Sequence, residues 1–166
     1  MAKITKEKGI ELAKRFIIYL IGLTLIAFGS NIAINSQLGI SPVNSIPLVL
    51  SLKFPILTKG NWATVIFCVF ILIQLLILWK NFKWYYVFQI LVSIVFGWLF
   101  DITTIPAKFC FPVVDNYFLR LLYIAISVVV IALGVMLYLE GNIMSMPAEG
   151  VTVAVSQRTK WTVATC

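Results

Sequence analysis

The stretch LGISPVNSIPLVLS, from Leu38 to Ser51, decides the fold that the sequence predicts. A related stretch, IMSMPAEGVTVAVS, runs from Ile143 to Ser156, and both stretches follow a long apolar segment. Neither is long or unbroken enough to cross a bilayer, which takes about 20 consecutive apolar residues in a helix. We therefore expect two short broken or re-entrant helices beside longer spanning ones.

The two stretches end a longer gapless repeat with an offset of 105 residues. Identities in apolar sequence arise easily because few residue types are used, whereas paired glycines and prolines are harder to obtain by chance. Internal repeats are a known device of membrane transporters. The matched pairs include Arg15/Arg120, Ile21/Ile126, Ile26/Ile131, Ala27/Ala132, Gly29/Gly134, Pro42/Pro147 and Ser51/Ser156.

The composition is that of an integral membrane protein. Of the 166 residues, 61% are hydrophobic and 11% are charged, whereas soluble domains carry roughly 25% charged residues. The sequence predicts an all-α integral membrane protein with four transmembrane helices. The apolar runs are Ile17–Ile34, Ala63–Trp79, Trp84–Phe100 and Tyr117–Leu139. The first exceeds the roughly 7 to 15 apolar residues of a signal peptide, so we expect it to remain as a span.

The basic residues predict the orientation, because they concentrate on the cytoplasmic side of membrane proteins. Alternating spans put nine of them on the side of the N-terminus and four on the other. We expect a cytoplasmic N-terminus in the cell (inner) membrane and an inverted repeat, whose copies enter from opposite sides. The net charge of +7 then needs no nucleic-acid partner. The nine are Lys3, Lys6, Lys8, Lys14, Arg15, Lys80, Lys83, Arg158 and Lys160, and the four are Lys53, Lys59, Lys108 and Arg120.

The residue inventory argues against an enzyme or a cofactor protein. The chain has no histidine, and its three cysteines form no C-x-x-C pair, which excludes histidine-ligated metal or haem sites and histidine-activated nucleophiles. The acids beyond the N-terminal segment show no carboxylate pair at metal spacing. We therefore expect no metal, no cofactor and no enzymatic activity. Those acids are Asp101, Asp115, Glu140 and Glu149.

Polar residues at the ends of helices are the candidates for binding a solute. Ser41 and Pro42 are expected as N-cap and first residue of the first short helix, with Asn44 in its first turn. Glu149 takes the corresponding place in the second, where it either faces a ligand or stabilises the helix dipole. The candidate binding residues are Asn35, Ser41, Pro42, Asn44, Gly97, Asp101, Pro147, Glu149 and Gly150.

Several of these candidates have alternative interpretations. Asn31 and Asn35 share a helix face, which either leaves the membrane or borders a wet cavity. An acid within a span is a functional hypothesis, so Asp101 is either a proton or cation carrier or an interfacial cap or salt bridge. Gln74 is expected to make a hydrogen bond between helices. Val151–Val155 has strand propensity, but a lone strand in lipid leaves its backbone unsatisfied, so a helix is predicted.

Three ordered motifs resemble the YczE/YyaS/YitT-type family of bacterial integral membrane proteins, and its YczE branch most of all. They are Leu38-Gly39-Ile40-Ser41-Pro42-Val43-Asn44, the pair Gly97 and Asp101, and Pro147-Ala148-Glu149-Gly150 with Ser156-Gln157-Arg158-Thr159. Asn44 stands where the family often has Asp. The resemblance also implies a further membrane segment after Cys166, so the chain is expected to be truncated at its C-terminus.

Together these features predict a single membrane domain over 1–166, with a first repeat at 15–79, a linking span at 84–105 and an incomplete second repeat at 117–166. The predicted function is a small-molecule transporter or permease that uses the two opposed short helices. The alternative is an accessory or scaffold protein that binds a partner or lipid through its basic faces. The expected partners are the lipid bilayer, a polar or anionic small solute and a second copy of the chain in a homodimer.

Overall fold

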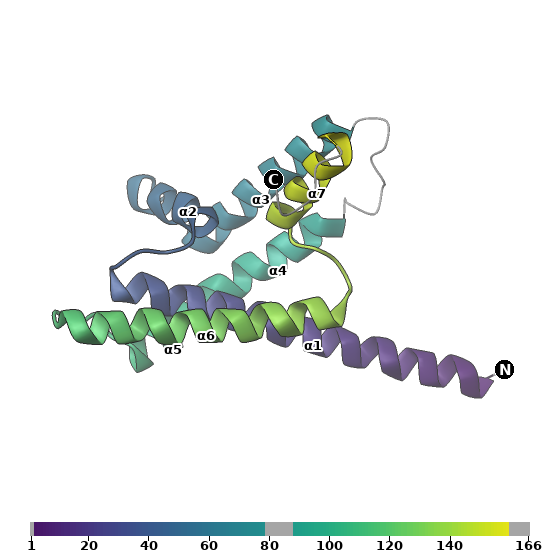
Figure 1. Cartoon of the computed structure of the whole chain (residues 1–166), viewed down its shortest axis with the longest axis horizontal. Coiled ribbons are helices and arrows are strands. Elements are labelled where there is room, and N and C mark those ends of the chain that lie inside the picture. Colours follow the sequence, from purple (N-terminus) through teal and green to yellow (C-terminus); the bar gives the residue numbers. More distant parts are fainter. Residues whose placement is uncertain (1, 79–87, 160–166) are drawn as a thin grey trace. The chain divides into compact units, whose positions relative to one another are not determined.

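The computed structural model describes residues 2–78 and 88–159, with side chains given for most of them. Its regular secondary structure in those ranges is helical, with no strand (Figure 1). The helices are α1 (Ala2–Ser36), α2 (Pro42–Lys53), α3 (Lys59–Leu78), α4 (Gln89–Ile102), α5 (Thr104–Cys110), α6 (Tyr117–Gly141) and α7 (Pro147–Thr159). The predicted all-α class is therefore confirmed, and Val151–Val155 lies inside a helix.

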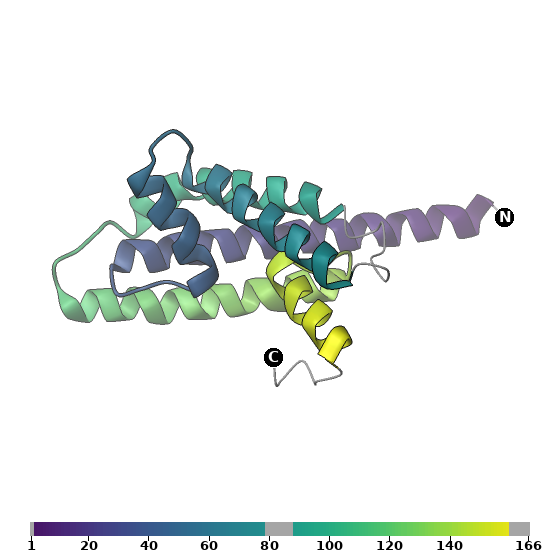
Figure 2. The ribbon, with the colours of Figure 1, turned by 90° about the horizontal axis from the view of Figure 1, so that it is seen from above.

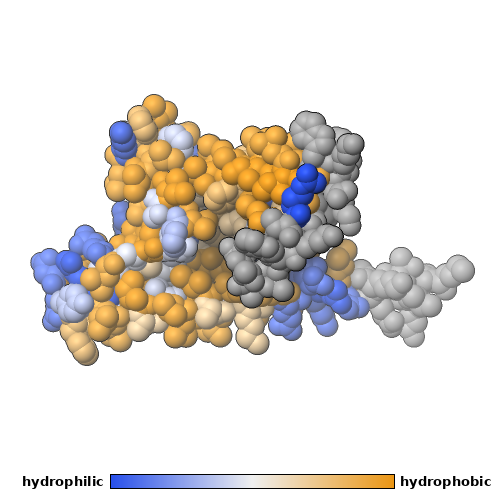
Figure 3. All heavy atoms as spheres, turned by 45° about the horizontal axis from the view of Figure 1, so that its top comes forward, coloured by the Kyte–Doolittle hydropathy of each residue, from blue (hydrophilic) through white to orange (hydrophobic). Residues whose placement is uncertain are grey.

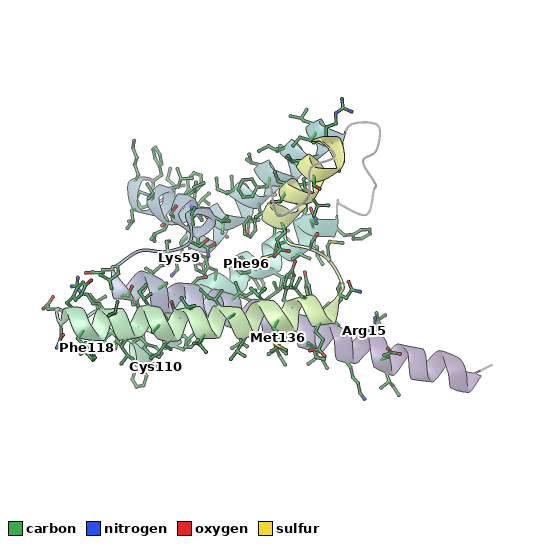
Figure 4. All side chains as sticks on the ribbon, viewed as in Figure 1. Arg15, Lys59, Phe96, Cys110, Phe118 and Met136 are labelled. Carbon is green, nitrogen blue, oxygen red and sulfur yellow. The ribbon has the colours of Figure 1, made fainter. Side chains whose placement is uncertain are left out.

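Four stretches of the described chain are long and apolar enough to cross a membrane: Ile10–Ser36, Lys59–Leu78, Gln89–Cys110 and Tyr117–Gly141. They match the four predicted spans. Figure 3 shows hydrophobic side chains over most of the visible described surface, as expected of helices that face lipid. The side chains of Phe118 and Met136 on α6, labelled in Figure 4, are 72% and 66% exposed. The protein is therefore a multi-pass membrane protein.

The two short helices are present. α2 has 12 residues and α7 has 13, and each begins with proline at its first helical position. Proline suits this position because the missing N–H has no partner in the first turn. Both helices are well short of the roughly 20 residues that span a bilayer. Pro47 lies within α2 and does not end it.

The chain folds as two compact units, which are described separately. The first contains Met1–Ile40 and Ile102–Ile143, and the second contains Ser41–Asp101 and Met144–Cys166. Each unit combines a piece from each predicted repeat. The predicted repeats at 15–79 and 117–166 are defined by sequence similarity, whereas the two units are defined by contacts in the structure. The division into repeats therefore stays a prediction.

In the first unit, α1 packs lengthwise on α6, and Figures 1 and 2 show the two helices side by side. The helices are antiparallel, since the ring of Tyr19 lies 5.4 Å from that of Tyr138 near the end of α6, whereas Gly29 lies beside Ser127 near its middle. Small residues let helix backbones approach closely in membranes. A Cβ atom on Gly29 would lie 3.2 Å from Ile131 N and from Ser127 O.

Gly134 on α6 has contacts of the same kind. A Cβ atom there would lie 2.8 Å from the backbone N of Ile26 and 2.9 Å from the carbonyl oxygen of Gly22. Backbone atoms cannot move aside as a flexible side chain does. The seam between α1 and α6 therefore depends on glycine on both helices.

α5 corrects one expectation. From the sequence, Lys108–Asn116 is expected to form the outer loop between the third and fourth spans, but the helix runs to Cys110. Thr103 forms a turn between α4 and α5, and Pro106 then occupies the first turn of α5, where a missing N–H costs little. The proline permits a helix at this position and does not end one.

In the second unit, α3 packs against both α2 and α7. α3 also meets α4 through a buried aromatic cluster, in which the rings of Phe67 and Phe96 are 5.6 Å apart. The Thr64 hydroxyl on α3 donates a hydrogen bond to the carbonyl of Ser93 on α4, at 3.2 Å. α3 is therefore the central helix of this unit.

Two sequence features lie partly or wholly outside the described residues. From the sequence, a tight cytoplasmic turn is expected at Lys80–Lys83, with an aromatic belt of Trp79, Trp84, Tyr85 and Tyr86 around it. These residues lie outside the described ranges. The basic segment Ala2–Lys14 is helical and continuous with the first span, although the side chains of residues 2–9 are not described. An ion pair at 2.8 Å joins Glu11 of this segment to Arg15, the residue that follows it.

Candidate functional site

The start of α7 is held by a glutamine from α3. Gln74 is fully buried, and its Nε2 donates a hydrogen bond to the carbonyl oxygen of Pro147 at 2.9 Å. Pro147, also fully buried, is the first residue of α7. The hydrogen bond predicted for Gln74 between helices is therefore present, and it anchors one of the two short helices.

Gly150 makes room for this glutamine. A Cβ atom at Gly150 would lie 2.5 Å from Gln74 Oε1 and 2.8 Å from its Nε2. The amide of Gln74 thus lies flat against the first turns of α7. Glycine is needed here for close approach, because any side chain would displace the amide.

A second glutamine binds the residues that lead into α7. Gln89, at the start of α4, is fully buried. Its Nε2 lies 3.2 Å from the carbonyl oxygen of Ser145 and 3.4 Å from the Ser145 hydroxyl. Two buried amides from different helices therefore hold residues 145 and 147 of one short connection.

Both glutamines keep an oxygen that no described group satisfies. The Oε1 atoms of Gln74 and Gln89 are buried and accept no hydrogen bond from the described residues. Their orientation follows from chemistry: each amide faces a backbone carbonyl, which only accepts, so the NH₂ group must be turned toward it. Burial of an unsatisfied polar atom costs about 1–3 kcal/mol. These two oxygens are the principal polar anomaly among the described residues.

Asp101 caps α3. Its Oδ1 accepts a hydrogen bond from Gly60 N at 2.9 Å, and its Oδ2 accepts one from the Thr58 hydroxyl at 2.5 Å. The Thr58 oxygen in turn accepts from Asn61 N at 3.2 Å. A carboxylate at a helix N-terminus satisfies free N–H groups and interacts favourably with the dipole. Of the two interpretations of Asp101, these contacts match the interfacial cap.

Gly97 lies one turn before Asp101 and belongs to the same arrangement. Its backbone contacts that of Gly60, and a Cβ atom on either glycine would overlap the other helix. Close packing of α3 on α4 brings the carboxylate of Asp101 within reach of the start of α3. Nearby, the ammonium of Lys59, labelled in Figure 4, lies 4.9 Å from the centre of the Phe100 ring.

The start of α2 is more open than the start of α7. Ser41 is the N-cap residue, but its side chain makes no capping hydrogen bond, and both Ser41 and Pro42 are exposed. Asn44 in the first turn is buried. Glu149, at the corresponding place in α7, is partly buried.

Asn35 lies in the first unit. Asn31 and Asn35 are both buried, and their amides donate hydrogen bonds to Thr103 Oγ1 at 2.9 Å and to Phe111 O at 3.0 Å. This polar face of α1 therefore binds the residues that flank α5 on either side, Thr103 and Phe111. Both amides are buried and are hydrogen-bonded to other parts of the protein.

The predicted residues thus form separate groups. Pro147 and Gly150 meet at Gln74, Gly97 and Asp101 meet at Gly60, and Asn35 binds within the other unit. From the sequence, Gln74 was expected only to join helices by a hydrogen bond, and Gln89 was not among the candidate residues. A usable signal was present, since Gln74 is the strongly polar residue of an otherwise apolar span. Within the described chain, no group of three or more His, Cys, Asp or Glu could hold a metal ion.

Comparison with known proteins agrees with the assignment as a membrane protein. The model of a family of unknown function, DUF6198, matches residues 13–166. The uncharacterized membrane protein YczE of Bacillus subtilis (strain 168) is 26% identical over 154 residues, which cover 92% of this chain and 68% of that protein. No solved structure gives a significant match. The resemblance to YczE-type membrane proteins is confirmed, and the chain belongs to the DUF6198 family of unknown function.

Proposed function

We propose that the protein is a transporter or permease for a small polar solute, which binds at the starts of two short helices, α2 and α7. The observation that carries the proposal is the buried polar environment at the start of α7. Gln74 and Gln89 are fully buried and bind Pro147 and Ser145. Transporters of several folds bind substrates at the ends of discontinuous helices inside the membrane.

The proposal includes an inverted repeat, and the seam between α1 and α6 supports it. Gly29 and Gly134 are 105 residues apart, as are Pro42 and Pro147. The atoms that face the two glycines are Ile131 N with Ser127 O, and Ile26 N with Gly22 O. The residue numbers of the two pairs differ by 105: Ile131 corresponds to Ile26, and Ser127 corresponds to Gly22. An antiparallel contact that maps onto itself in this way is what a two-fold relation between repeats requires.

The proposal also assigns sides and partners. The excess of basic residues on one side supports a cytoplasmic N-terminus in the cell membrane. α2 then enters from the outside and α7 from the inside. The working partners are the bilayer and the solute, and no enzymatic step is required.

A flux assay tests the proposal. The full chain is reconstituted into liposomes, and uptake is measured for a panel of neutral, anionic and cationic small solutes. We expect at least one solute to enter faster than into protein-free liposomes. The double variant Glu149→Gln, Asp101→Asn should reduce that flux, whereas Asp115→Asn, Glu140→Gln should not, because Asp115 and Glu140 are exposed.

The absence of any flux above that of protein-free liposomes across the panel would reject transport. It would leave the accessory or scaffold function, for which neutralising the lysines at 3–14 and 80–83 is the next test. Full flux in the double variant Glu149→Gln, Asp101→Asn would instead show that the solute moves without these two acids, and would reject their part in the site.

A further inference from the structure

The two unsatisfied glutamine oxygens specify the kind of ligand that fits at the start of α7. Gln74 Oε1 and Gln89 Oε1 are hydrogen-bond acceptors and are fully buried. The NH₂ groups of the same two amides already donate to the carbonyl oxygens of Pro147 and Ser145. An acceptor is satisfied only by a hydrogen-bond donor or a cation. The oxygen of Gln74 also lies against Gly150, so it borders the first turns of α7.

The described groups around this point disfavour an anion. Two buried amide oxygens there need hydrogen-bond donors, and Glu149 lies in the first turn of α7. An anion would therefore meet two acceptors, and the charge of Glu149 would oppose the attraction of the helix start. This narrows the sequence-based expectation of a polar or anionic solute.

A cation is also a poor fit. The start of a helix carries a partial positive charge of roughly half a unit. A cation buried within a membrane protein also needs several charged or numerous oxygen partners, whereas the described groups supply two neutral amide oxygens and the single carboxylate of Glu149. A neutral group that donates hydrogen bonds has neither disadvantage.

We propose that the start of α7, with Gln74 and Gln89, binds an uncharged solute group that donates hydrogen bonds, such as an amide N–H or a hydroxyl. The inference rests on the proposed function, since it names the class of solute for one of the two helix ends. The two Oε1 atoms accept from the solute, while the NH₂ groups of the same amides keep the connection at residues 145–147 in place.

Three small molecules of nearly equal shape test the charge requirement: acetamide, acetate and acetamidinium. The full chain is placed in nanodiscs, and saturation transfer from protein to each methyl group is measured by NMR, with protein-free nanodiscs as blank. We expect transfer to acetamide that saturates with concentration, and weaker transfer to the two ions. Stronger transfer to acetate or acetamidinium would overturn the proposal. Equal or absent transfer for all three would also overturn it, and would leave water as the partner of the two oxygens.

Variants then locate the binding. Gln74→Met and Gln89→Met keep side-chain length but remove the acceptors, and each should weaken acetamide binding roughly 2- to 12-fold. The matched control is Ser93→Ala, whose hydroxyl bonds only to its own helix, at Gln89 O. Unchanged binding in both methionine variants would contradict the assignment. If a variant does not fold, the three-probe comparison on the unaltered chain still decides.

The outcomes separate this inference from the proposed function. Acetamide binding that depends on Gln74, without flux of any solute, keeps the site and rejects transport. Flux of a charged solute without acetamide binding keeps transport and rejects the neutral site.

Discussion

Gln74 and Gly150 form a pair whose coupling can be measured. An alanine at Gly150 would place its Cβ 2.5 Å from Gln74 Oε1, so the amide must shift and weaken its bond to Pro147. We predict that Gly150→Ala lowers the free energy of unfolding by about 1–3 kcal/mol, as overpacking does. Denaturant titration of the full chain in detergent, followed by circular dichroism, measures the change.

The control is a double-mutant cycle. In a Gln74→Ala background the obstructing amide is gone, so Gly150→Ala should cost much less, with a coupling energy of about 0.5–3 kcal/mol. Additive effects of the two substitutions would show that the close contact is not what makes glycine necessary.

Asp101 gives a second prediction at the scale of the residue. Asp101→Ala removes the acceptors for Gly60 N and the Thr58 hydroxyl, and we expect a loss of about 1–3 kcal/mol in the free energy of unfolding. Asp115→Ala is the comparison, because Asp115 is fully exposed and lies 3.6 Å from Arg120. Exposed pairs of this kind contribute little, so equal effects of the two substitutions would count against the cap.

Whether the role of a residue can be predicted from the sequence depends on how far along the chain its contacts lie. Proline at 42 and 147 was assigned correctly, because its preference for a first helical turn is local. The roles of Asp101 and Gln89 depend on partners 41 and 56 positions away. Nothing in the local sequence names such a partner, so two interpretations of Asp101 remained open and Gln89 was passed over.

At the scale of the element, the glycine seam between α1 and α6 makes a sharp prediction. Gly134→Leu would press a side chain against the backbone of Ile26 and Gly22, and we expect a loss of about 1–3 kcal/mol or more in the free energy of unfolding. Ala132→Leu places the same side chain on the exposed face of α6 and should have little effect. A thermal melt of each full-length variant in detergent compares the two. Similar losses would mean that α6 tolerates no leucine for reasons unrelated to the seam.

The sequence predicted which segments form helices more reliably than it predicted where those helices begin and end. Long apolar runs fix a membrane helix because the bilayer requires backbone groups to be satisfied within it. The helical residues Lys108–Cys110 were missed because they lie beyond the apolar run Trp84–Phe100. Pro106 is compatible with this helix, since proline is tolerated in a first turn. The α1 helix also extends back to Ala2, since a basic segment can continue a helix into water without a sequence signal.

At the scale of the whole molecule, the repeat and the compact units divide the chain differently. Each unit takes one piece from each predicted repeat. A sequence offset can reveal related halves, but it does not specify which pieces pack together, because packing depends on side chains such as Gln74 that the other copy need not share. The four spans and two short helices were predicted, and so was a candidate site at the start of the second short helix, whereas its contacts with Gln74 and Gln89 came from the structure.

The opposed entry of α2 and α7 is the central claim, and single-cysteine accessibility tests it most directly. The native cysteines 68, 110 and 166 are replaced by serine, and a cysteine is placed at Asn44 or Glu149. The chain is reconstituted in sealed liposomes of known orientation, and an impermeant thiol reagent is added to each side in turn. The controls are Val49→Cys and Val153→Cys, on exposed apolar positions of the same helices.

We predict that the cysteine at position 44 reacts from the outside and that at 149 from the cytoplasmic side, because in the proposed arrangement a solute reaches each helix start from its own side of the membrane. The control positions should stay unlabelled, because they face lipid. Labelling of 44 and 149 from the same side, or equal labelling of the control positions, would contradict the inverted arrangement of the two helices.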